Sequence, residues 1–225
     1  MKQRTQKPAT RARRDRPDLR ERLVDAALKE FAAHGFDGAS TRAIAQRVGA
    51  HQPQINYHFA SKDALWRAAI DHLFDLLLQQ LELGALATSD GAALPNEFAN
   101  LLRRFVHFAA DHPELNRIMV HEATSPGPRL AWMTEHHVKP YFDALQPVWL
   151  RLVDAGIAAP IDARLIHHVL VGAASLVFVN AHEFELLVGE DPTSADWVER
   201  HADGLIAMLL PGLRRPRARP ARPHR

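Results

Sequence analysis

Apolar residues recur every three to four positions along most of this 225-residue chain, which is the spacing of an amphipathic α-helix. The first apolar stripe follows Asp18, a favourable N-cap residue, and runs through Leu23, Ala27 and Phe31. We expect Gly35 to end that helix, since glycine readily adopts the left-handed conformation of a C-terminal cap. Because Leu and Ala supply most of the apolar positions, the pattern predicts an all-α protein.

Two short helices and a longer one are predicted to follow. Ser40 is the expected N-cap of the first short helix, and Gly49 ends it. The second covers Gln52–His58, with Pro53 in its first turn, where a missing N–H group has no cost. Ser61 is the expected N-cap of the longer helix. The first helix and the two short helices, within residues 18–59, are joined by tight turns, which is typical of a helix-turn-helix unit.

The rest of the chain reads as a larger helical bundle. After a loop at residues 84–95, the pattern predicts five further helical stretches, near Glu97–Asp111, Pro113–Ala123, Arg129–Ala155, Asp162–Val188 and Ala195–Leu210. The two ends are basic, polar and Pro-containing, without an apolar period, and we expect them to be disordered. The predicted organisation is therefore an arm at 1–17, a helix-turn-helix domain at 18–65, a bundle at 66–210 and a tail at 211–225.

Charge is distributed unevenly along the chain. Residues 1–62 hold 13 Lys or Arg against 6 Asp or Glu, whereas residues 63–210 hold 9 against 20. The tail 211–225 adds six Arg and no acidic residue. A basic N-terminal part beside an acidic remainder favours contact with a polyanion at the N-terminal end. The alternative is a basic face and tail that are merely solvated.

Several functional classes are disfavoured by composition. The chain has no Cys, which excludes disulfides, thiolate metal sites and Cys nucleophiles. It shows no Gly-rich phosphate loop and no nucleophile elbow, so we expect neither an enzyme nor a cofactor. The N-terminus lacks the apolar core of a secretory signal, and the longest apolar run, Val169–Val179, is shorter than the roughly 20 residues that span a bilayer. We expect a cytoplasmic protein without membrane contact.

The third helix of the N-terminal domain has two different faces. Ile55 and Phe59 form its apolar side, which we expect to pack on the first two helices. The predicted exposed side holds Gln52, Gln54, Asn56, Tyr57 and His58. Amide side chains can pair with adenine in the major groove, and Tyr and His side chains can reach phosphates. This face is therefore a candidate reader of double-stranded DNA.

One run of residues resembles the TetR/AcrR family of bacterial transcription regulators, over about residues 19–66. It reads Phe31-x3-Gly35-Phe36-x2-Ala39-Ser40-Thr41-x2-Ile44-Ala45-x2-Val48-Gly49, then Ile55-Asn56-Tyr57-His58-Phe59-x-Ser61-Lys62-Asp63-x-Leu65. Two positions depart from the family pattern: His51 stands where Ser or Thr is frequent, and Asn56 where an aromatic residue is frequent. The rest of the chain is similar to the family in length and helical pattern.

The resemblance implies a homodimer that binds a palindromic operator. It also implies that a small-molecule effector, bound in the C-terminal domain at 66–210, weakens DNA binding, and that the regulator is usually a repressor. By the same resemblance, Thr41, Tyr57, His58 and Lys62 contact phosphates. Gln52, Gln54 and Asn56 lie on the matching recognition helix.

Large apolar residues on successive helices of the predicted bundle are candidates for lining an effector site, because such sites are mostly apolar with a few polar groups. The alternative for each residue is plain core packing. The candidate ligand-binding residues are Phe74, Phe105, Phe108, Met119, Trp132, Met133, His136, Trp149, Phe178 and His182.

Nine histidines lie between residues 97 and 210, but none shows the HxxxH or HExxH spacing of a zinc site. We therefore expect no metal site.

The stretch Val169–Val179 is apolar all round the predicted helix, and Gly172 and Ala173 would allow another helix to approach closely. This helix and the last one, Ala195–Leu210, are the expected homodimer interface, with a helix buried within one monomer as the alternative.

Three functional hypotheses remain open. The first is a ligand-responsive DNA-binding repressor, in which the fourth helix couples the two domains. The second is an activator or an architectural DNA-binding protein that senses nothing. The third is a metal-dependent enzyme that uses the histidines.

Overall fold

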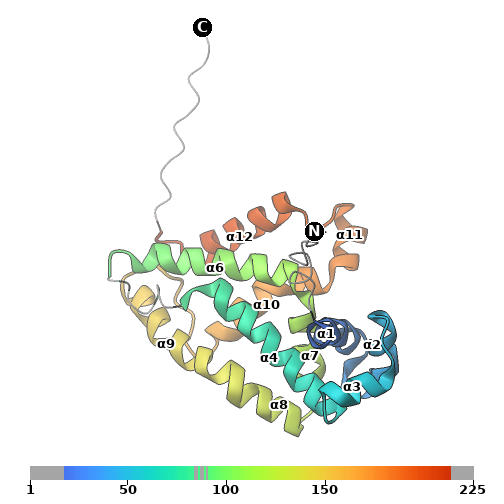
Figure 1. The fold of residues 1–225 in the computed structure, drawn as a ribbon. Helices are drawn as coiled ribbons and strands as arrows, with labels where there is room; N and C mark the ends of the chain where they lie inside the picture. The colour runs from blue at the N-terminus through green and yellow to red at the C-terminus, as the bar shows by residue number, and fades with distance from the viewer. Residues whose placement is uncertain (1–17, 84–85, 87–88, 90, 214–225) are drawn as a thin grey trace, which may run out of the picture. The chain divides into compact units, whose positions relative to one another are not determined.

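The structure, a computed structural model, describes residues 18–83, 86, 89 and 91–213. The predicted arm at 1–17 and most of the predicted tail, 214–225, lie outside the described residues. Every regular element in the described ranges is a helix, which confirms the all-α prediction (Figure 1). The chain divides into two compact units, Met1–Ala69 and Ile70–Arg225.

The first unit contains α1 (Leu19–Gly38), α2 (Thr41–Arg47), α3 (Gln52–His58) and the beginning of α4 (Lys62–Leu81). Local sequence signals set these boundaries. The carboxylate of Asp18 accepts a hydrogen bond from the backbone N of Glu21 at 2.9 Å, and the Glu21 carboxylate accepts one from the backbone N of Asp18 at 3.1 Å. Such a capping box satisfies N–H groups that a helix start leaves unpaired.

Gly35 interrupts α1, as the sequence predicts, with φ of 65°. A short helical turn then continues to Gly38, and Ser40 caps α2 by accepting a hydrogen bond from the backbone N of Ala43 at 3.3 Å. The core of this unit is formed by apolar residues of all four helices that are at most 5% exposed. They include Leu23, Ala27, Phe31, Ile44, Ile55, Phe59, Leu65 and Trp66.

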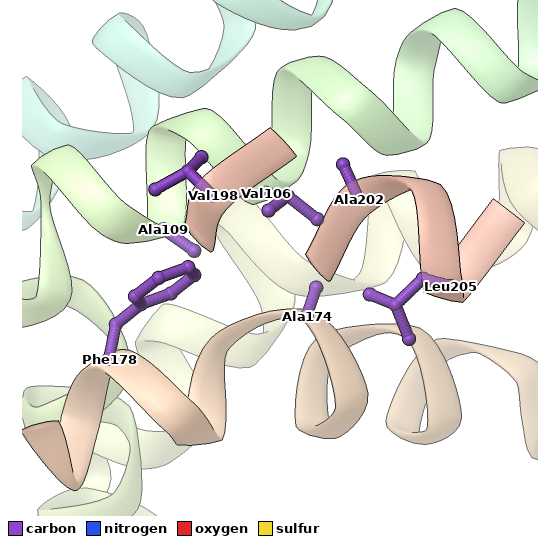
Figure 2. Packing of buried hydrophobic residues seen from close by; sticks show 7 residues of the cluster. All are labelled: Val106, Ala109, Ala174, Phe178, Val198, Ala202 and Leu205. Atoms are coloured by element: carbon purple, nitrogen blue, oxygen red, sulfur yellow. The ribbon is translucent and has the colours of Figure 1, made fainter. Parts of the chain in front are cut away.

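Among the described residues, the second unit contains the end of α4 and eight further helical elements. These are α6 (Leu94–Asp111), α7 (Pro113–Ala123), α8 (Pro128–Met133), the π-helical segment η1 (Thr134–Val138), α9 (Lys139–Asp154), α10 (Ile166–Val179), α11 (Ala181–Val188) and α12 (Ala195–Leu209). Helix α6 packs against both α10 and α12. Figure 2 shows their shared core, in which Val106 of α6, Phe178 of α10 and Ala202 of α12 meet.

Two predicted helices differ from those observed. The stretch predicted at Arg129–Ala155 is interrupted by the π-helical turn η1. The single helix predicted at Asp162–Val188 is wrong, because the chain there forms α10 and α11 with a bend of 69° between them. Asn180 stands at the bend in a non-helical conformation, and its side chain amide donates to Glu183 at 3.4 Å. Asn competes for local hydrogen bonds in this way and so favours helix ends.

Among the described helices, none is by itself long and apolar enough to cross a membrane. Helices α10 and α11 taken together would suffice in length and composition, but the 69° bend separates them.

Candidate DNA-binding face and candidate effector cavity

A tight turn in the first unit connects α2 to α3. Gly49 has φ of 68°, a left-handed conformation that favours glycine, and the backbone N of Ala50 donates to the carbonyl O of Ala45 at 2.9 Å. The guanidinium of Arg22 on α1 donates to the carbonyl O of Val48. This bond joins α1 to the turn, so the angle between α2 and α3 is supported by a third element.

Helix α3 has one buried and one exposed face, as predicted. Ile55 is 1% exposed and Phe59, just after the helix, is 5% exposed, whereas Tyr57 is 86% exposed. Gln52, Gln54 and Asn56 are also exposed, and His58 is half-buried. The edge of the Tyr57 ring meets the His58 ring at a centroid distance of 5.1 Å. The helix therefore presents amide and phenol groups to solvent on a rigid support.

Two of the candidate base-reading amides already have partners within the unit. The Oε1 atom of Gln54 accepts a hydrogen bond from the backbone N of His51 at 2.8 Å, so Gln54 caps the start of α3. The Nε2 atom of Gln52 donates to Oγ1 of Thr41 at 3.4 Å, which links α3 to α2. Sequence reasoning missed the cap at Gln54, although a Gln three residues after an N-cap is a known signal for it.

Lys62 lies at the start of α4. Its Nζ donates to the carbonyl O of Asp37 at 3.3 Å and lies 4.8 Å from the centroid of the Phe36 ring. Ser61 caps the helix by accepting from the backbone N of Ala64 at 3.0 Å, as predicted. The ammonium group of Lys62 thus lies between the end of α1 and the N-terminus of α4, where helix N–H groups favour an anion.

A buried carboxylate that sequence reasoning missed organises the same unit. Glu30 of α1 is 4% exposed. It accepts a hydrogen bond from the backbone N of Ser40 at 3.2 Å and pairs with the guanidinium of Arg47 at 3.3 Å. These partners matter because an unpaired buried charge is costly. Since Ser40 precedes α2 and Arg47 is its last residue, the Glu30 carboxylate connects both ends of α2 to α1. A signal was available, since Glu30 interrupts the apolar stripe of α1 beside Phe31.

The second unit has a partly open cavity of about 250 Å³, which is lined mainly by residues of α4, α6, α7, α9 and α10. Its wall has 23 described residues, of which 18 are aliphatic or aromatic without a polar atom. The five polar residues are His112, Asn116, Tyr141, His167 and Ser175. Mostly apolar clefts with a few polar groups are typical of small-molecule sites.

Four of the ten candidate ligand-binding residues line this cavity: Phe74, Phe105, Phe108 and Met119. The other six do not, and three of these, Met133, Trp149 and Phe178, are core residues at most 1% exposed. The Nε1 atom of Trp149 donates to the carbonyl O of Ile161 at 2.9 Å, and Phe178 belongs to the core of α6, α10 and α12 (Figure 2). Met133 and Trp149 therefore have the position that plain core packing predicts, whereas Phe178 also borders a second, smaller group of pocket-lining residues on α10, α11 and α12.

The remaining three candidates lie outside the cavity wall. The rings of Trp132 and His136 stack on each other with centroids 5.2 Å apart, and Nδ1 of His136 is 2.8 Å from the carbonyl O of Trp132. The side chain of His182 is 93% exposed, on the far side of the bend that the predicted continuous helix did not include.

The polar residues of the cavity wall were missed by sequence reasoning. The Nδ2 atom of Asn116 donates to Oγ of Ser175 at 2.8 Å. Burial lowers the pKa of His167, as does the neighbouring charge of His168. Burial also raises the pKa of Tyr141, with a further contribution from the negative charge of Asp75. At neutral pH both His167 and Tyr141 are therefore uncharged.

A histidine of the π-helical segment lies next to the cavity wall. The ring of His137 stacks on Phe74 with centroids 4.4 Å apart, and its Nε2 atom lies 2.9 Å from the carboxylate of Asp71. Phe74 and Asp71 both belong to α4, so His137 joins η1 to the helix that also begins in the first unit. A π-helical turn is often found at functional sites.

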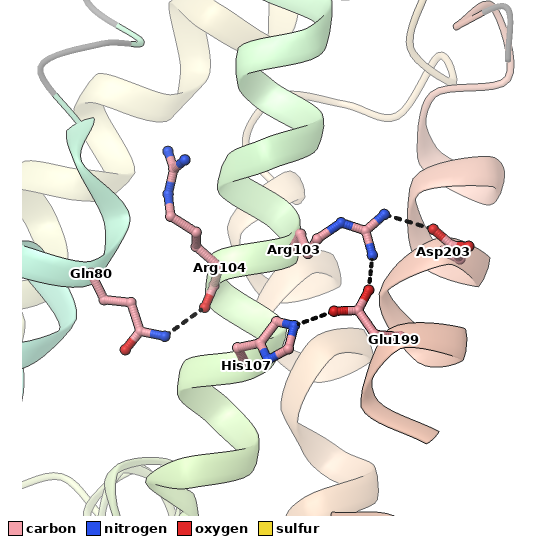
Figure 3. Close-up of polar contacts among 6 residues, drawn as sticks. All are labelled: Gln80, Arg103, Arg104, His107, Glu199 and Asp203. Atoms are coloured by element: carbon pink, nitrogen blue, oxygen red, sulfur yellow. Dashed lines mark hydrogen bonds and ion pairs between the residues drawn. The ribbon is translucent and has the colours of Figure 1, made fainter. Parts of the chain in front are cut away.

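Polar contacts connect α6 to two neighbouring helices (Figure 3). Arg103 pairs with Glu199 and, at 2.6 Å, with Asp203, while Nε2 of His107 lies 2.8 Å from Glu199. The hydrogen bond with His107 lowers the pKa of Glu199, and Arg103 lowers it further. On the other side, Nε2 of Gln80 donates to the carbonyl O of Arg104 at 3.4 Å. Helix α6 is thereby held to α12 and to the end of α4.

Small and apolar residues remain exposed on α10 and α12. Leu176 is 54% exposed and Met208 is 57% exposed. Each lies one helical turn after an exposed glycine, Gly172 or Gly204, at which an added Cβ would meet no atom within 4 Å.

Within the described residues, no group of three or more His, Asp or Glu side chains is arranged to hold a metal ion.

A helix-turn-helix unit with a polar exposed helix, joined to a helical domain with an apolar cavity, defines the class of DNA-binding regulatory proteins. A family model described as bacterial regulatory proteins, tetR family, matches residues 23–69. A second, described as the tetracyclin repressor-like C-terminal domain, matches residues 95–209, half of the chain. The chain therefore belongs to the TetR family of bacterial transcriptional regulators, which are not enzymes.

Individual relatives agree with this assignment. The chain is 22% identical over 198 residues to the transcriptional regulator RutR of Escherichia coli K12, covering 85% of this chain and 89% of that protein. It is 26% identical over 225 residues to the transcriptional repressor NicS of Pseudomonas putida, covering 94% and 99%. The fold is similar to AibR in complex with isovaleryl coenzyme A and operator DNA, with a TM-score of 0.69, 19% identity and coverage of 86% and 99%.

Proposed function

We propose that the exposed face of α3 reads the bases of a palindromic operator and that residues around it anchor the phosphates. Gln52, Gln54 and Asn56 are the proposed base-reading residues. Thr41, Tyr57, His58 and Lys62 are the proposed phosphate contacts. The observation that carries the proposal is the two-sided character of α3, with Ile55 buried and Tyr57 86% exposed.

The proposal requires a rearrangement of two side chains on DNA. Gln54 must exchange its hydrogen bond with His51, and Gln52 its bond with Thr41, for partners on the base edges. The capping bond of Gln54 and the bond between Gln52 and Thr41 do not involve the side chain of Asn56. We therefore expect Asn56 to contribute to sequence recognition without a compensating loss inside the protein.

A mobility-shift titration with the upstream region of the protein's own gene tests the function. A regulator with one operator shifts that DNA at concentrations at which random DNA of equal length is unshifted. Asn56→Ala should weaken operator binding about 10- to 100-fold while it leaves random DNA unaffected. Equal loss on both DNAs would show that α3 does not read sequence, and equal shifts by the unmodified protein would indicate an architectural DNA-binding protein.

We further propose that the cavity of the second unit binds the effector. Phe74, Phe105, Phe108 and Met119 line it together with His167 and Tyr141. The similar AibR structure contains both isovaleryl coenzyme A and operator DNA, which supports a regulator that binds a small molecule as well as DNA without identifying the effector of this chain. Because the similar protein NicS is a transcriptional repressor, we propose that this chain is also a repressor and that it acts in the cytoplasm, where its operator is located.

Helix α4 is the proposed connection between effector and DNA. It begins with Lys62 in the first unit and contains Phe74 in the wall of the cavity. A ligand that displaces Phe74 would also disturb the stacked His137 and its contact with Asp71. A coupling free energy of about 1–3 kcal/mol is enough to change operator affinity 5- to 150-fold. By thermodynamic reciprocity, operator DNA must weaken effector binding by the same factor.

The proposed homodimer uses the exposed faces of α10 and α12. Gly172 and Leu176 on α10, and Gly204 and Met208 on α12, have the four-residue spacing that places small and apolar groups on one helix face. Two such helices from each protomer would form a four-helix interface.

A further inference from the structure

We propose that the cavity of the second unit selects an uncharged, largely apolar molecule of about ten non-hydrogen atoms, and that it rejects carboxylates, phosphates and ammonium ions. This inference rests on the proposal that the cavity is the effector site.

The size of the ligand follows from the volume of the cavity. An engineered protein cavity of about 150 Å³ holds one benzene molecule. The cavity described here has a volume of about 250 Å³. In the same proportion it accommodates about ten non-hydrogen atoms, which corresponds to a fused pair of aromatic rings or a small terpene.

The selection against charge follows from the lining. None of the 23 described wall residues is Asp, Glu, Lys or Arg. An ion that enters an apolar site without a counter-ion loses its hydration and gains no partner. We therefore expect a charged ligand to bind at least about 100-fold more weakly than its neutral counterpart.

The arginines of α6 and α7, two helices that line the cavity, each have hydrogen-bonding partners within the protein. Arg103 pairs with Glu199 and Asp203 on α12. Arg104 donates from Nη2 to the carbonyl O of Leu81 at 2.9 Å, and Arg117 donates to the carbonyl O of Val179 at 3.1 Å. These three are the arginines of α6 and α7, so neither helix directs a guanidinium into the cavity.

Two neutral polar side chains, those of His167 and Ser175, lie on the same face of α10. His167, Val171 and Ser175 are spaced by four residues, which places them on one face of the helix, and all three line the cavity. The imidazole of His167 is uncharged at neutral pH because burial lowers its pKa. Ser175 bonds to Asn116 of α7 at 2.8 Å. The Ser175 hydroxyl also donates to the carbonyl O of Val171, so the imidazole of His167 is the group on this face that can exchange a hydrogen bond with a ligand hydroxyl or carbonyl without an ion.

Three naphthalene derivatives provide a matched test by isothermal titration calorimetry on the full-length protein at pH 7.5. 2-Naphthylmethanol is neutral, 2-naphthoate is anionic and 2-naphthylmethylamine is cationic, while their ring systems are the same. We expect the alcohol to bind at least about 100-fold more tightly than either ion. Tighter or equal binding of the anion or of the amine would overturn the inference.

Two variants of adjacent residues on α7 assign the binding to the cavity. Met119 lines the cavity, whereas its neighbour Val120 is 51% exposed. Met119→Trp should fill the site and abolish binding of the alcohol, whereas Val120→Trp should leave it unchanged. Met119→Lys should supply the missing counter-ion and raise the affinity for 2-naphthoate at least tenfold, with Val120→Lys as its control. If Met119→Lys does not fold, the comparison of the three ligands and of Met119→Trp with Val120→Trp still tests whether the cavity selects a neutral ligand.

The outcomes distinguish the proposal that the cavity is the effector site from the proposal that its ligand is uncharged. Binding that favours an ion and is abolished by Met119→Trp contradicts the ligand class but keeps the cavity as the effector site. Binding of none of the three probes, or binding unaffected by Met119→Trp, contradicts the effector site itself and the ligand class with it.

Discussion

The buried carboxylate of Glu30 should contribute measurably to the stability of the helix-turn-helix unit. Its hydrogen bond with the backbone N of Ser40 involves a charged acceptor, and such bonds contribute about 1.5–3 kcal/mol. Its pair with Arg47 adds at most about 1 kcal/mol, because the Arg47 side chain is 49% exposed and the charge is screened by water. Glu30→Ala should therefore reduce the free energy of unfolding of this unit by about 2–4 kcal/mol.

Hydrogen exchange of the backbone amides in α1 to α3, followed by mass spectrometry, measures this change for the first unit separately from the second. Protection factors in α2 should fall most, since Glu30 contacts the residues at both of its ends. Glu30→Gln keeps an acceptor oxygen for Ser40 and should cost about half as much, because a neutral acceptor bonds about half as strongly. Arg47→Ala should cost less than Glu30→Ala, because the backbone N of Ser40 still donates to the carboxylate.

The order of these three variants is the essential result. If Arg47→Ala destabilises the unit as much as Glu30→Ala, then the ion pair, and not the bond with Ser40, is the main contribution. If Glu30→Ala leaves the exchange of α2 unchanged, the carboxylate does not hold α2, and the assignment of a structural role to it is wrong.

Three further predictions concern the proposed sites. Lys62→Ala should weaken binding to all DNA sequences alike and reduce the slope of log affinity against log salt concentration by about one unit, so an unchanged slope would exclude a phosphate contact. Gly172→Asp should give a monomer in analytical ultracentrifugation with intact helix content, since the added Cβ meets no atom of its own protomer. Gly127→Asp, at an equally open position, should remain dimeric, and a dimeric Gly172→Asp would place the interface elsewhere. Burial keeps the pKa of His167 below its ordinary value of 6.5, so the unfolded chain binds that proton more readily and the free energy of unfolding should fall as the pH drops below about 6.5. His167→Asn should flatten that pH dependence in urea titrations, and an unaltered dependence would assign it to other groups.

The helix boundaries of the first unit could be predicted from sequence because their causes are local. Asp18, Ser40 and Ser61 accept hydrogen bonds from backbone N–H groups within three residues, and Gly49 supplies a left-handed turn. The two faces of α3 follow from its helical period in the same way. A signal that acts over three or four residues is present in the sequence whatever the rest of the chain does.

The bend at Asn180 and the π-helical turn at 134–138 were not predicted, because the apolar period continues through both. A periodic pattern reports which side of a helix is apolar, but a helix can end inside such a pattern when a side chain offers an alternative hydrogen bond. Packing against other helices decides whether the helix continues or ends at such a position, and the sequence pattern of one segment does not show that packing.

The residues of the cavity wall were predicted only in part, because a buried apolar residue can face either a cavity or other side chains of the core. The sequence determined that Phe74, Trp149 and Phe178 are apolar and lie on helical stripes, so each was bound to be inside the second unit. Tertiary structure alone decided that Phe74 faces the cavity between α4, α6, α7, α9 and α10, whereas Trp149 and Phe178 do not border that cavity. It also decided that His167 and Asn116, polar residues of separate helices, border the same space. An empty space is a property of the gap between several helices, and its position depends on how their side chains fit together, which no single helix encodes.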